Sequence, residues 1–214
     1  SAMTVVGVTG TNGKTTVSHL LAQSLVVPDT AVCGLISTLG YGTIDNLTPG
    51  PNTTPEPVTL HGLLAEMRGR NIRRVVMEVS SHGLDQRRVA GVEFDMAILT
   101  NLSRDHLDYH ITLENYAAAK RRLFTEYQIS QAVINLDDDF GNSLAGELKT
   151  EVVGYTLRPR PELVTKRKHP AVSGSIITCQ EGKMHIEVDS PWGKALLISP
   201  LLGRFNAYNM LACL

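Results

Sequence analysis

A glycine-rich segment near the N-terminus constrains the fold of this chain more than any other feature. The β-branched run from Thr4 to Val8 predicts a strand, and Thr15 to Val26 carries apolar residues at helical spacing. The sequence that leads from one to the other is Gly7-Val8-Thr9-Gly10-Thr11-Asn12-Gly13-Lys14-Thr15-Thr16. A glycine-rich connection from a strand into a helix predicts a phosphate-binding loop, because backbone N–H groups and the positive end of the helix converge on phosphate oxygens.

Two side chains of this segment suit the same role. Lys14 can reach the β- and γ-phosphates of a nucleotide, and the Thr15 hydroxyl can bind Mg²⁺. The segment departs from the common GxxxxGK[ST] pattern, since Val8 stands where the first glycine would be and Gly10 follows two residues later. An ordinary strand-to-helix turn with a surface lysine is the alternative, and the combination of strand, loop and helix favours the phosphate site.

Strands and helices alternate over most of the chain. The further predicted strands are 31–36, 73–79, 94–100, 132–136 and 151–156, and the predicted helices are 58–70, 113–127 and 141–148. The turn-rich stretch from Gly40 to Pro57 predicts a long loop of the kind that is usually functional. Alternation implies right-handed βαβ crossovers. We therefore expect a three-layer α/β fold of the P-loop type, with a mostly parallel sheet and helices on both faces.

The pattern changes towards the C-terminus. A Pro-rich, basic loop is predicted from Arg158 to Pro170, followed by short strands at 174–180, 184–189 and 195–199 that form a small antiparallel sheet at the edge of the same domain. Ser1 to Met3 is interpreted as a cloning remnant, so the domain covers residues 4–214. The apolar end from Leu211 to Leu214 predicts a chain that stops within a helix of a longer protein.

Composition excludes several classes of function. The 20 Lys and Arg nearly balance the 21 Asp and Glu and are scattered, so we expect no nucleic-acid or membrane partner. No apolar run approaches the roughly 20 residues that cross a bilayer. The three cysteines, Cys33, Cys179 and Cys213, lie far apart, which argues against a disulfide framework or a zinc cluster and fits the cytoplasm.

Polar residues follow two of the predicted strands. Glu78 ends an apolar run, and a magnesium nucleotide needs such a carboxylate near its phosphates, although a solvated surface charge is the alternative. His106 lies in a titratable stretch after the next strand, where it could bind a metal or relay a proton with Asp105 orienting it. A packed structural histidine is the other interpretation. Lys120, taken by itself, has the pattern of a solvated helix lysine.

Taken together, these segments resemble the Mur ligase family, the ATP-dependent amide ligases of bacterial cell-wall synthesis. The resemblance covers nearly the whole chain. Within the family, the Asn-Thr-Thr-Pro and Glu-Val-Ser-Ser-His-Gly segments are similar to those of the ligases that add the third residue to UDP-MurNAc-L-Ala-D-Glu. The matching segments are 10–16, 52–56, 77–84, Gln86 with Arg88, 100–110, 116–120 and 202–209.

The resemblance implies roles for individual residues. ATP phosphates would be held by Gly10, Thr11, Asn12, Gly13, Lys14, Thr15 and Thr16, and adenine would be approached by Asn206 and Asn209. One Mg²⁺ would be bound by Thr15 and Glu78, and a second by His106 with support from Lys120, which in this family is carbamylated by CO₂. The UDP-MurNAc-dipeptide would be contacted by Asn52, Thr53, Thr54, Ser80, Gln86 and Arg88.

By this resemblance the chain is the central, ATP-binding domain of a cytoplasmic and monomeric ligase. The enzyme would add meso-diaminopimelate or L-lysine through an acyl-phosphate, releasing ADP and phosphate. The N-terminal uridine-binding and C-terminal domains of the family are absent, so the fragment alone is expected to bind ATP weakly and to be inactive. A related folylpolyglutamate- or cyanophycin-type ligase is one alternative, which the Asn-Thr-Thr-Pro segment and Gln86 with Arg88 oppose. A nucleotide-binding regulatory module without chemistry is another, which the paired metal candidates oppose.

Overall fold

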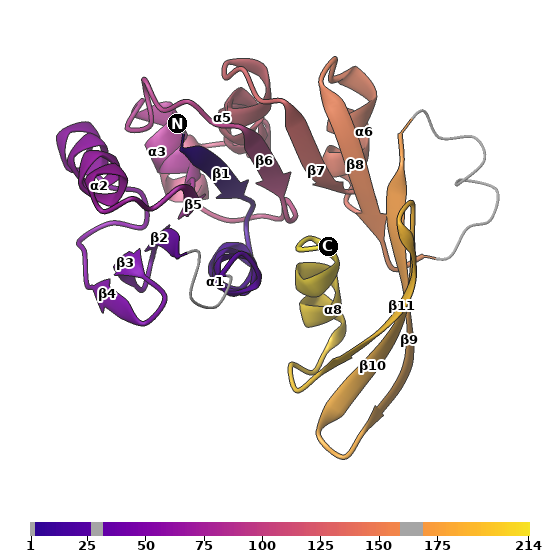
Figure 1. Ribbon diagram of the computed structural model, residues 1–214. Helices are drawn as coiled ribbons and strands as arrows, with labels where there is room; N and C mark the ends of the chain where they lie inside the picture. Colours follow the sequence, from indigo (N-terminus) through magenta and orange to yellow (C-terminus); the bar gives the residue numbers. More distant parts are fainter. Residues whose placement is uncertain (1–2, 27–31, 159–168) are drawn as a thin grey trace.

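The computed structural model describes residues 3–26, 32–158 and 169–214, and it contains one mixed β-sheet with helices on both of its faces (Figure 1). Ser1, Ala2, Ala31 and most of the predicted loop 158–170 lie outside the described residues. The strand order is β11-β10-β9-β8-β7-β6-β1-β5-β2-β3-β4. The three-layer architecture predicted from the alternation of strands and helices is therefore confirmed.

The elements follow the predicted order closely. The strands are β1 (Thr4–Thr9), β2 (Cys33–Ser37), β3 (Gly40–Thr43), β4 (Asn46–Thr48), β5 (Arg74–Glu78), β6 (Met96–Leu99), β7 (Gln131–Asn135), β8 (Glu151–Thr156), β9 (Ala171–Gln180), β10 (Lys183–Ser190) and β11 (Gly193–Ser199). The helices are α1 (Lys14–Ser24), α2 (Pro57–Gly69), α3 (Ser81–Asp85), α4 (Leu107–His110), α5 (Leu113–Thr125), α6 (Asp139–Glu147) and α8 (Arg204–Leu211). Nowhere in the described ranges is a helix long and apolar enough to cross a membrane.

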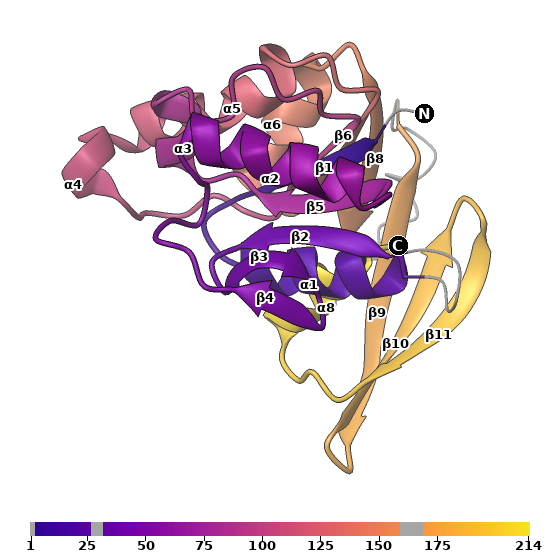
Figure 2. The same ribbon diagram turned by 60° about the vertical axis from the view of Figure 1, so that its left-hand side comes forward.

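Alternate side chains of the central strands enter two separate cores. Val5 and Val75 face the core that is covered by α2, α3, α5 and α6, whereas Val6 and Val76 face the core that is covered by α1 and α8. The two views agree that α1 and α8 lie together on one side of the sheet (Figures 1 and 2). A strand buried on both faces reads as a continuous apolar run, which explains the runs of valine in the sequence.

The sheet is parallel in its centre and antiparallel at both ends. β1 pairs in parallel with β5 and β6, with Val8 opposite Glu78 and Thr9 opposite Leu99. The carboxyl ends of these three strands therefore lie side by side at one edge. In open α/β sheets, ligands bind at this edge.

Two features differ from the prediction. The stretch predicted as a long loop contains the short hairpin β3–β4, which extends the sheet beyond β2. Gly40 and Gly42, both with positive φ, belong to β3, so the sequence lacks the alternating side chains that would predict this strand. The C-terminal strands are antiparallel as predicted, but β9 pairs in parallel with β8, so they continue the main sheet and project from its edge (Figure 1).

Candidate functional site

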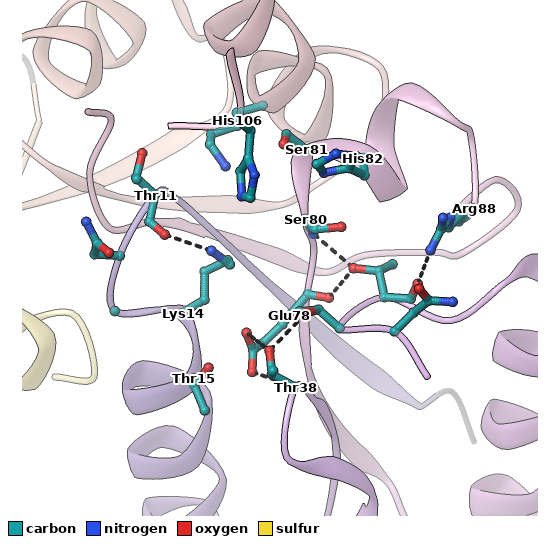
Figure 3. Close-up of a pocket in the computed structure, with 16 residues that line it drawn as sticks. Thr11, Lys14, Thr15, Thr38, Glu78, Ser80, Ser81, His82, Arg88 and His106 are labelled. Atoms are coloured by element: carbon teal, nitrogen blue, oxygen red, sulfur yellow. Dashed lines mark hydrogen bonds between the residues drawn. The ribbon is translucent and has the colours of Figure 1, made fainter. Parts of the chain in front are cut away.

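The glycine-rich loop connects β1 to α1 at the edge where β1, β5 and β6 end. The two residues that follow β6 hold the loop in place. Thr11 N donates to Asn101 O (2.8 Å), and Asn12 N donates to Asn101 Oδ1 (3.0 Å). Thr100 Oγ1 donates to Asn12 O (2.7 Å). Lys14 Nζ reaches back and donates to the carbonyls of Gly10 and Thr11, each at 2.9 Å. The loop is thus ordered by its own neighbours, with the Lys14 ammonium at its mouth (Figure 3).

Backbone N–H groups at the start of α1 are available to an anion. Within the described ranges, none of the amides from Gly13 to Thr16 donates a hydrogen bond to the protein. These are the first amides of an 11-residue helix, whose N-terminus carries partial positive charge. A helix N-terminus of this kind, behind a glycine-rich loop, fits the phosphates of a nucleotide.

Gly10 is required by the close approach of the loop to β6. Its φ is +146°, and a Cβ at this position would overlap the Thr100 hydroxyl. We expect Gly10→Ala to lower the free energy of unfolding by about 1 to 3 kcal/mol, the usual cost of backbone strain at one residue. Urea unfolding of the chain measures this. The control is Gly62→Ala, in α2 with no atom within 4 Å of the added Cβ, which should raise stability by up to about 1 kcal/mol. Equal stability of the two variants would contradict the steric argument.

Glu78 lies at the end of β5, directly beside the loop. Its side chain is fully buried, and its carboxylate accepts hydrogen bonds from Thr38 N (3.0 Å) and Thr38 Oγ1 (3.2 Å) at the end of β2. A buried carboxylate needs such partners, because an uncompensated charge in the interior is costly. The surface-charge interpretation of Glu78 is therefore wrong, and its carboxylate lines a cavity shared with Lys14.

The segment before α2 is attached to the same strand end. Thr54 Oγ1 donates to Glu78 O and accepts from Ser80 N, both at 2.9 Å. Arg88 Nη1 donates to Thr54 O at 3.0 Å. Thr53 lies beside Thr38, with 3.0 Å between their hydroxyl oxygens. These contacts hold a row of hydroxyl and guanidinium groups along the wall of the cavity (Figure 3).

Lys120 is buried instead of solvated. Only 1% of this residue is exposed, and its Nζ donates to Gly10 O at 2.8 Å. Burial lowers the pKa of Lys120 well below its usual value, the nearby charge of Lys14 lowers it further, and Asp105 opposes both. Burial also lowers the pKa of Lys14, against the carboxylates of Glu78 and Asp105. The prediction from the sequence pattern that Lys120 is solvated is therefore wrong, because α5 turns this residue towards the loop.

A single cavity of about 470 Å³ brings most of the predicted residues together. Glu78 and His106, which come from different strand ends, both line it. The other predicted residues in its wall are Thr11, Asn12, Gly13, Lys14, Thr15, Asn52, Thr53, Thr54, Ser80, Arg88 and Lys120. Gln86 lies outside this wall, although its Oε1 accepts from Arg88 Nε at 2.8 Å. The described residues contain no cluster of three or more His, Cys, Asp or Glu side chains suited to a metal.

A second cavity of about 600 Å³ lies on the other side of the loop, at α8. Gly13 and Thr16 line this cavity from the loop and the start of α1, and Asn209 and Phe205 line it from α8. Asn101 and Asp137 complete its wall. A Cβ at Gly13, whose φ is +88°, would overlap the Asn209 carboxamide. Asn206 supports this arrangement from the preceding turn, where its Oδ1 accepts from Asn209 Nδ2 at 3.3 Å. The two cavities therefore share the loop as their common wall.

Several cavity residues were given no role by the sequence. Thr38 is the hydrogen-bond partner of Glu78, and its place at the end of β2 is the one signal that could have identified it. Ser81 and His82 also line the first cavity and lie at the start of α3, just after β5. Ser81 Oγ is buried without a hydrogen-bond partner among the described residues.

The sequence of this chain also matches a known protein family. The Mur ligase middle domain matches residues 8–214. The chain belongs to the Mur ligase family. The resemblance that its motifs indicated is confirmed at the level of the family.

Individual Mur ligases are similar over the whole chain. The UDP-N-acetylmuramoyl-L-alanyl-D-glutamate--2,6-diaminopimelate ligase of Pseudomonas aeruginosa is 47% identical over 97% of the chain, which covers 41% of that protein. The ligase of the same name from Alkalilimnicola ehrlichii is 46% identical over 98%, again covering 41%. A solved structure of a ligase of this name has a TM-score of 0.83 at 34% identity, over 100% of this chain and 42% of the other. The chain thus spans about two fifths of these relatives.

Proposed function

We propose that this chain is the ATP-binding middle domain, residues 4–214, of a ligase that adds a diamino acid to UDP-MurNAc-L-Ala-D-Glu. The observation that carries the proposal is the convergence of Lys14, Glu78, His106 and Lys120 on one cavity in a Mur ligase middle domain. The names of the similar ligases favour 2,6-diaminopimelate as the amino acid over L-lysine. The parts of those relatives that this chain does not cover would complete the enzyme.

ATP is proposed to bind along the glycine-rich loop, with its phosphates at the N-terminus of α1. The free amides of Gly13 to Thr16 and the Lys14 ammonium supply donors and positive charge there. The Thr11 and Asn12 backbone lies in the same loop. Adenine would enter the second cavity, where Asn209 supplies a carboxamide and Asn206 holds it in place.

Two Mg²⁺ sites are proposed in the first cavity, which is lined by Thr15, Glu78, His106 and Lys120. Thr15 and Glu78 would hold the first, and His106 with Lys120 would hold the second. Two protein groups are enough for each site, because Mg²⁺ in nucleotide sites keeps several waters and binds through one or two protein groups plus phosphates. Bound Mg²⁺ would supply the positive charge that lets an anionic nucleophile approach a polyphosphate.

Lys120 is proposed to carry a carbamate. A neutral amine is the form that adds CO₂, and burial together with Lys14 favours the neutral form of Lys120. In this addition the nitrogen of the neutral amine forms a bond to the carbon of CO₂ and one proton leaves, so the neutral amine becomes an anionic carbamate. An anion at this position beside His106 would suit a cation, whereas a buried ammonium would repel it.

The remaining wall of the cavity is proposed to hold the second substrate. Asn52, Thr53, Thr54, Ser80 and Arg88 present amide, hydroxyl and guanidinium groups, which suit a molecule rich in hydroxyls, amides and carboxylates. Gln86 would act through its hydrogen bond to Arg88. The D-Glu carboxylate of that substrate would attack the γ-phosphorus as ADP leaves, and the amine would then displace phosphate from the acyl-phosphate and lose a proton. Lys14 and the loop amides would neutralise the phosphoryl oxygens during the first step.

This function can be tested by measuring ADP release from the full-length protein. We expect ADP release to require both UDP-MurNAc-L-Ala-D-Glu and diaminopimelate, and to be much slower with L-lysine in place of diaminopimelate. Folate with glutamate should give no ADP above background. Substrate-independent ATP binding with no ADP release in any mixture would support the regulatory-module alternative, and release with folate would support the folylpolyglutamate alternative. We further propose that the protein acts in the cytoplasm, where ATP is available, and as a monomer.

A further inference from the structure

The backbone does little to fix the His106 imidazole. His106 has left-handed backbone angles, with φ 52° and ψ 30°, just before the four-residue helix α4. Its side chain is 44% exposed, and its Nε2 lies 3.7 Å from Asp105 Oδ2, which is too long for a hydrogen bond. The direction in which the ring points therefore depends on the rings that pack against it.

Four rings form a closed cycle beside the first cavity, which is lined by Glu78 and Lys14. His106 packs edge-to-face on His82, with 5.0 Å between centroids and an angle of 85°. It also meets Tyr116 at 6.0 Å, Tyr116 meets His110 at 5.3 Å, and His110 meets His82 at 5.5 Å. The two contacts of His106 are edge-to-face and the other two are tilted, and rings packed at these separations limit one another's rotation.

His82 is one of the two rings that contact His106. It lies in α3, whose N-terminus is capped by Ser80 Oγ accepting from Gly83 N at 3.0 Å. The ring of Tyr109 packs on His82 at 4.2 Å, and the Tyr109 hydroxyl donates to Asp85 Oδ2 at 2.8 Å at the end of the same helix. His82 is therefore held between His106 and Tyr109, and Figure 3 shows it beside His106 at the cavity.

The other half of the cycle connects His106 to Lys120. Tyr116 is fully buried, its hydroxyl donates to Thr11 Oγ1 at 3.2 Å, and the Lys120 Nζ lies 4.4 Å from the centre of its ring. The two side chains assigned to the second metal site thus contact the same ring cycle. A change in the cycle that leaves Tyr116 in place should move His106 without moving Lys120.

We propose that His82 is a positioning residue, which holds the His106 imidazole in the orientation that binds the second Mg²⁺. This inference rests on the proposed function, because it assumes that His106 is a metal ligand. Mutation of a side chain that orients a metal ligand typically weakens metal binding by about 10- to 100-fold. The part of His82 that matters is the edge-to-face ring, since its contacts with His106 and Tyr109 are ring contacts.

The test is Mn²⁺ binding to the full-length protein with ADP present, followed by electron paramagnetic resonance, so that no turnover is needed. We expect His82→Ala to weaken binding of the second Mn²⁺ by about 10-fold or more. His82→Phe keeps a ring but offers no ring nitrogen, and it should restore most of the affinity. The KM for ATP should change little in either variant. The matched control is His61→Ala, an exposed histidine of α2 that lies outside the cavity.

A reference variant, His106→Ala, separates the metal-ligand role of His106 from the positioning role of His82. If His106→Ala leaves Mn²⁺ binding unchanged, the metal assignment in the proposed function is wrong. If His106→Ala weakens binding but His82→Ala does not, or His82→Phe binds no better than His82→Ala, the positioning role alone is overturned. Thermal unfolding of each variant shows whether a loss of metal affinity comes from a loss of fold, in which case His82→Phe decides the question.

Discussion

Replacing Lys14 with alanine is expected to reduce ADP release by the full-length protein by about 1000-fold or more. One charged group aimed at a transferring phosphoryl is worth roughly 10³ to 10⁵ in kcat. Lys14 Nζ is held by the carbonyls of Gly10 and Thr11 at the mouth of the loop, where its charge lies beside the proposed phosphate site. Steady-state ADP release with the complete set of substrates measures the effect.

The comparison variant is Lys183→Ala, which removes an exposed lysine from β10, far along the sheet from the loop. It should release ADP at the unaltered rate. Circular dichroism of Lys14→Ala should match the parent protein, since the change removes two hydrogen bonds to loop carbonyls and leaves both cores unaltered. Near-normal ADP release by a folded Lys14→Ala protein would overturn the assignment of the loop as the ATP phosphate site.

Much of the fold could be predicted because each central strand carries a strong signal. The run from Val75 to Met77 is apolar without interruption, since its side chains enter cores on both faces of the sheet. The loop residues and Glu78 could be predicted to lie together, because parallel strands end at the same edge. The hairpin β3–β4 could not be predicted, since Gly40 and Gly42 replace the alternating side chains on which strand prediction depends.

The environment of Lys120 was beyond the reach of the sequence. The stretch Ala117-Ala118-Ala119-Lys120-Arg121-Arg122 has three consecutive cations, which is typical of a solvated helix face. The structure separates them, because Lys120 is buried while Arg121 pairs with Glu147 of α6 near the surface. A period of 3.6 residues places neighbouring side chains about 100° apart, and only the packing of α5 decides which of them faces the loop. The family resemblance, and not the local pattern, assigned Lys120 a role at the second metal site.

Replacing Lys120 with alanine is expected to reduce activity by about 100-fold, the upper end of the cost of losing a group that supports a metal. Acetate or propionate should restore part of that activity. The buried Lys120 side chain leaves a space beside Tyr116 when it is truncated, and a short carboxylate there would place an anion near His106, as a carbamate would. The control is Lys149→Ala, which removes an exposed lysine and should neither lose activity nor respond to carboxylates.

The carbamate itself has a signature that does not depend on activity. In ¹³C-labelled bicarbonate, the parent protein should show a carbamate carbon signal that is missing from Lys120→Ala and retained by Lys149→Ala. Removal of CO₂ should lower the activity of the parent protein and leave Lys120→Ala unaffected, since that variant has no amine to modify. Burial and the nearby charge of Lys14 lower the pKa of Lys120, which favours the neutral amine that adds CO₂. If carboxylates fail to restore activity and the lysine shows no carbamate signal, Lys120 acts as an amine that holds the Gly10 carbonyl, and the second metal site loses its anion.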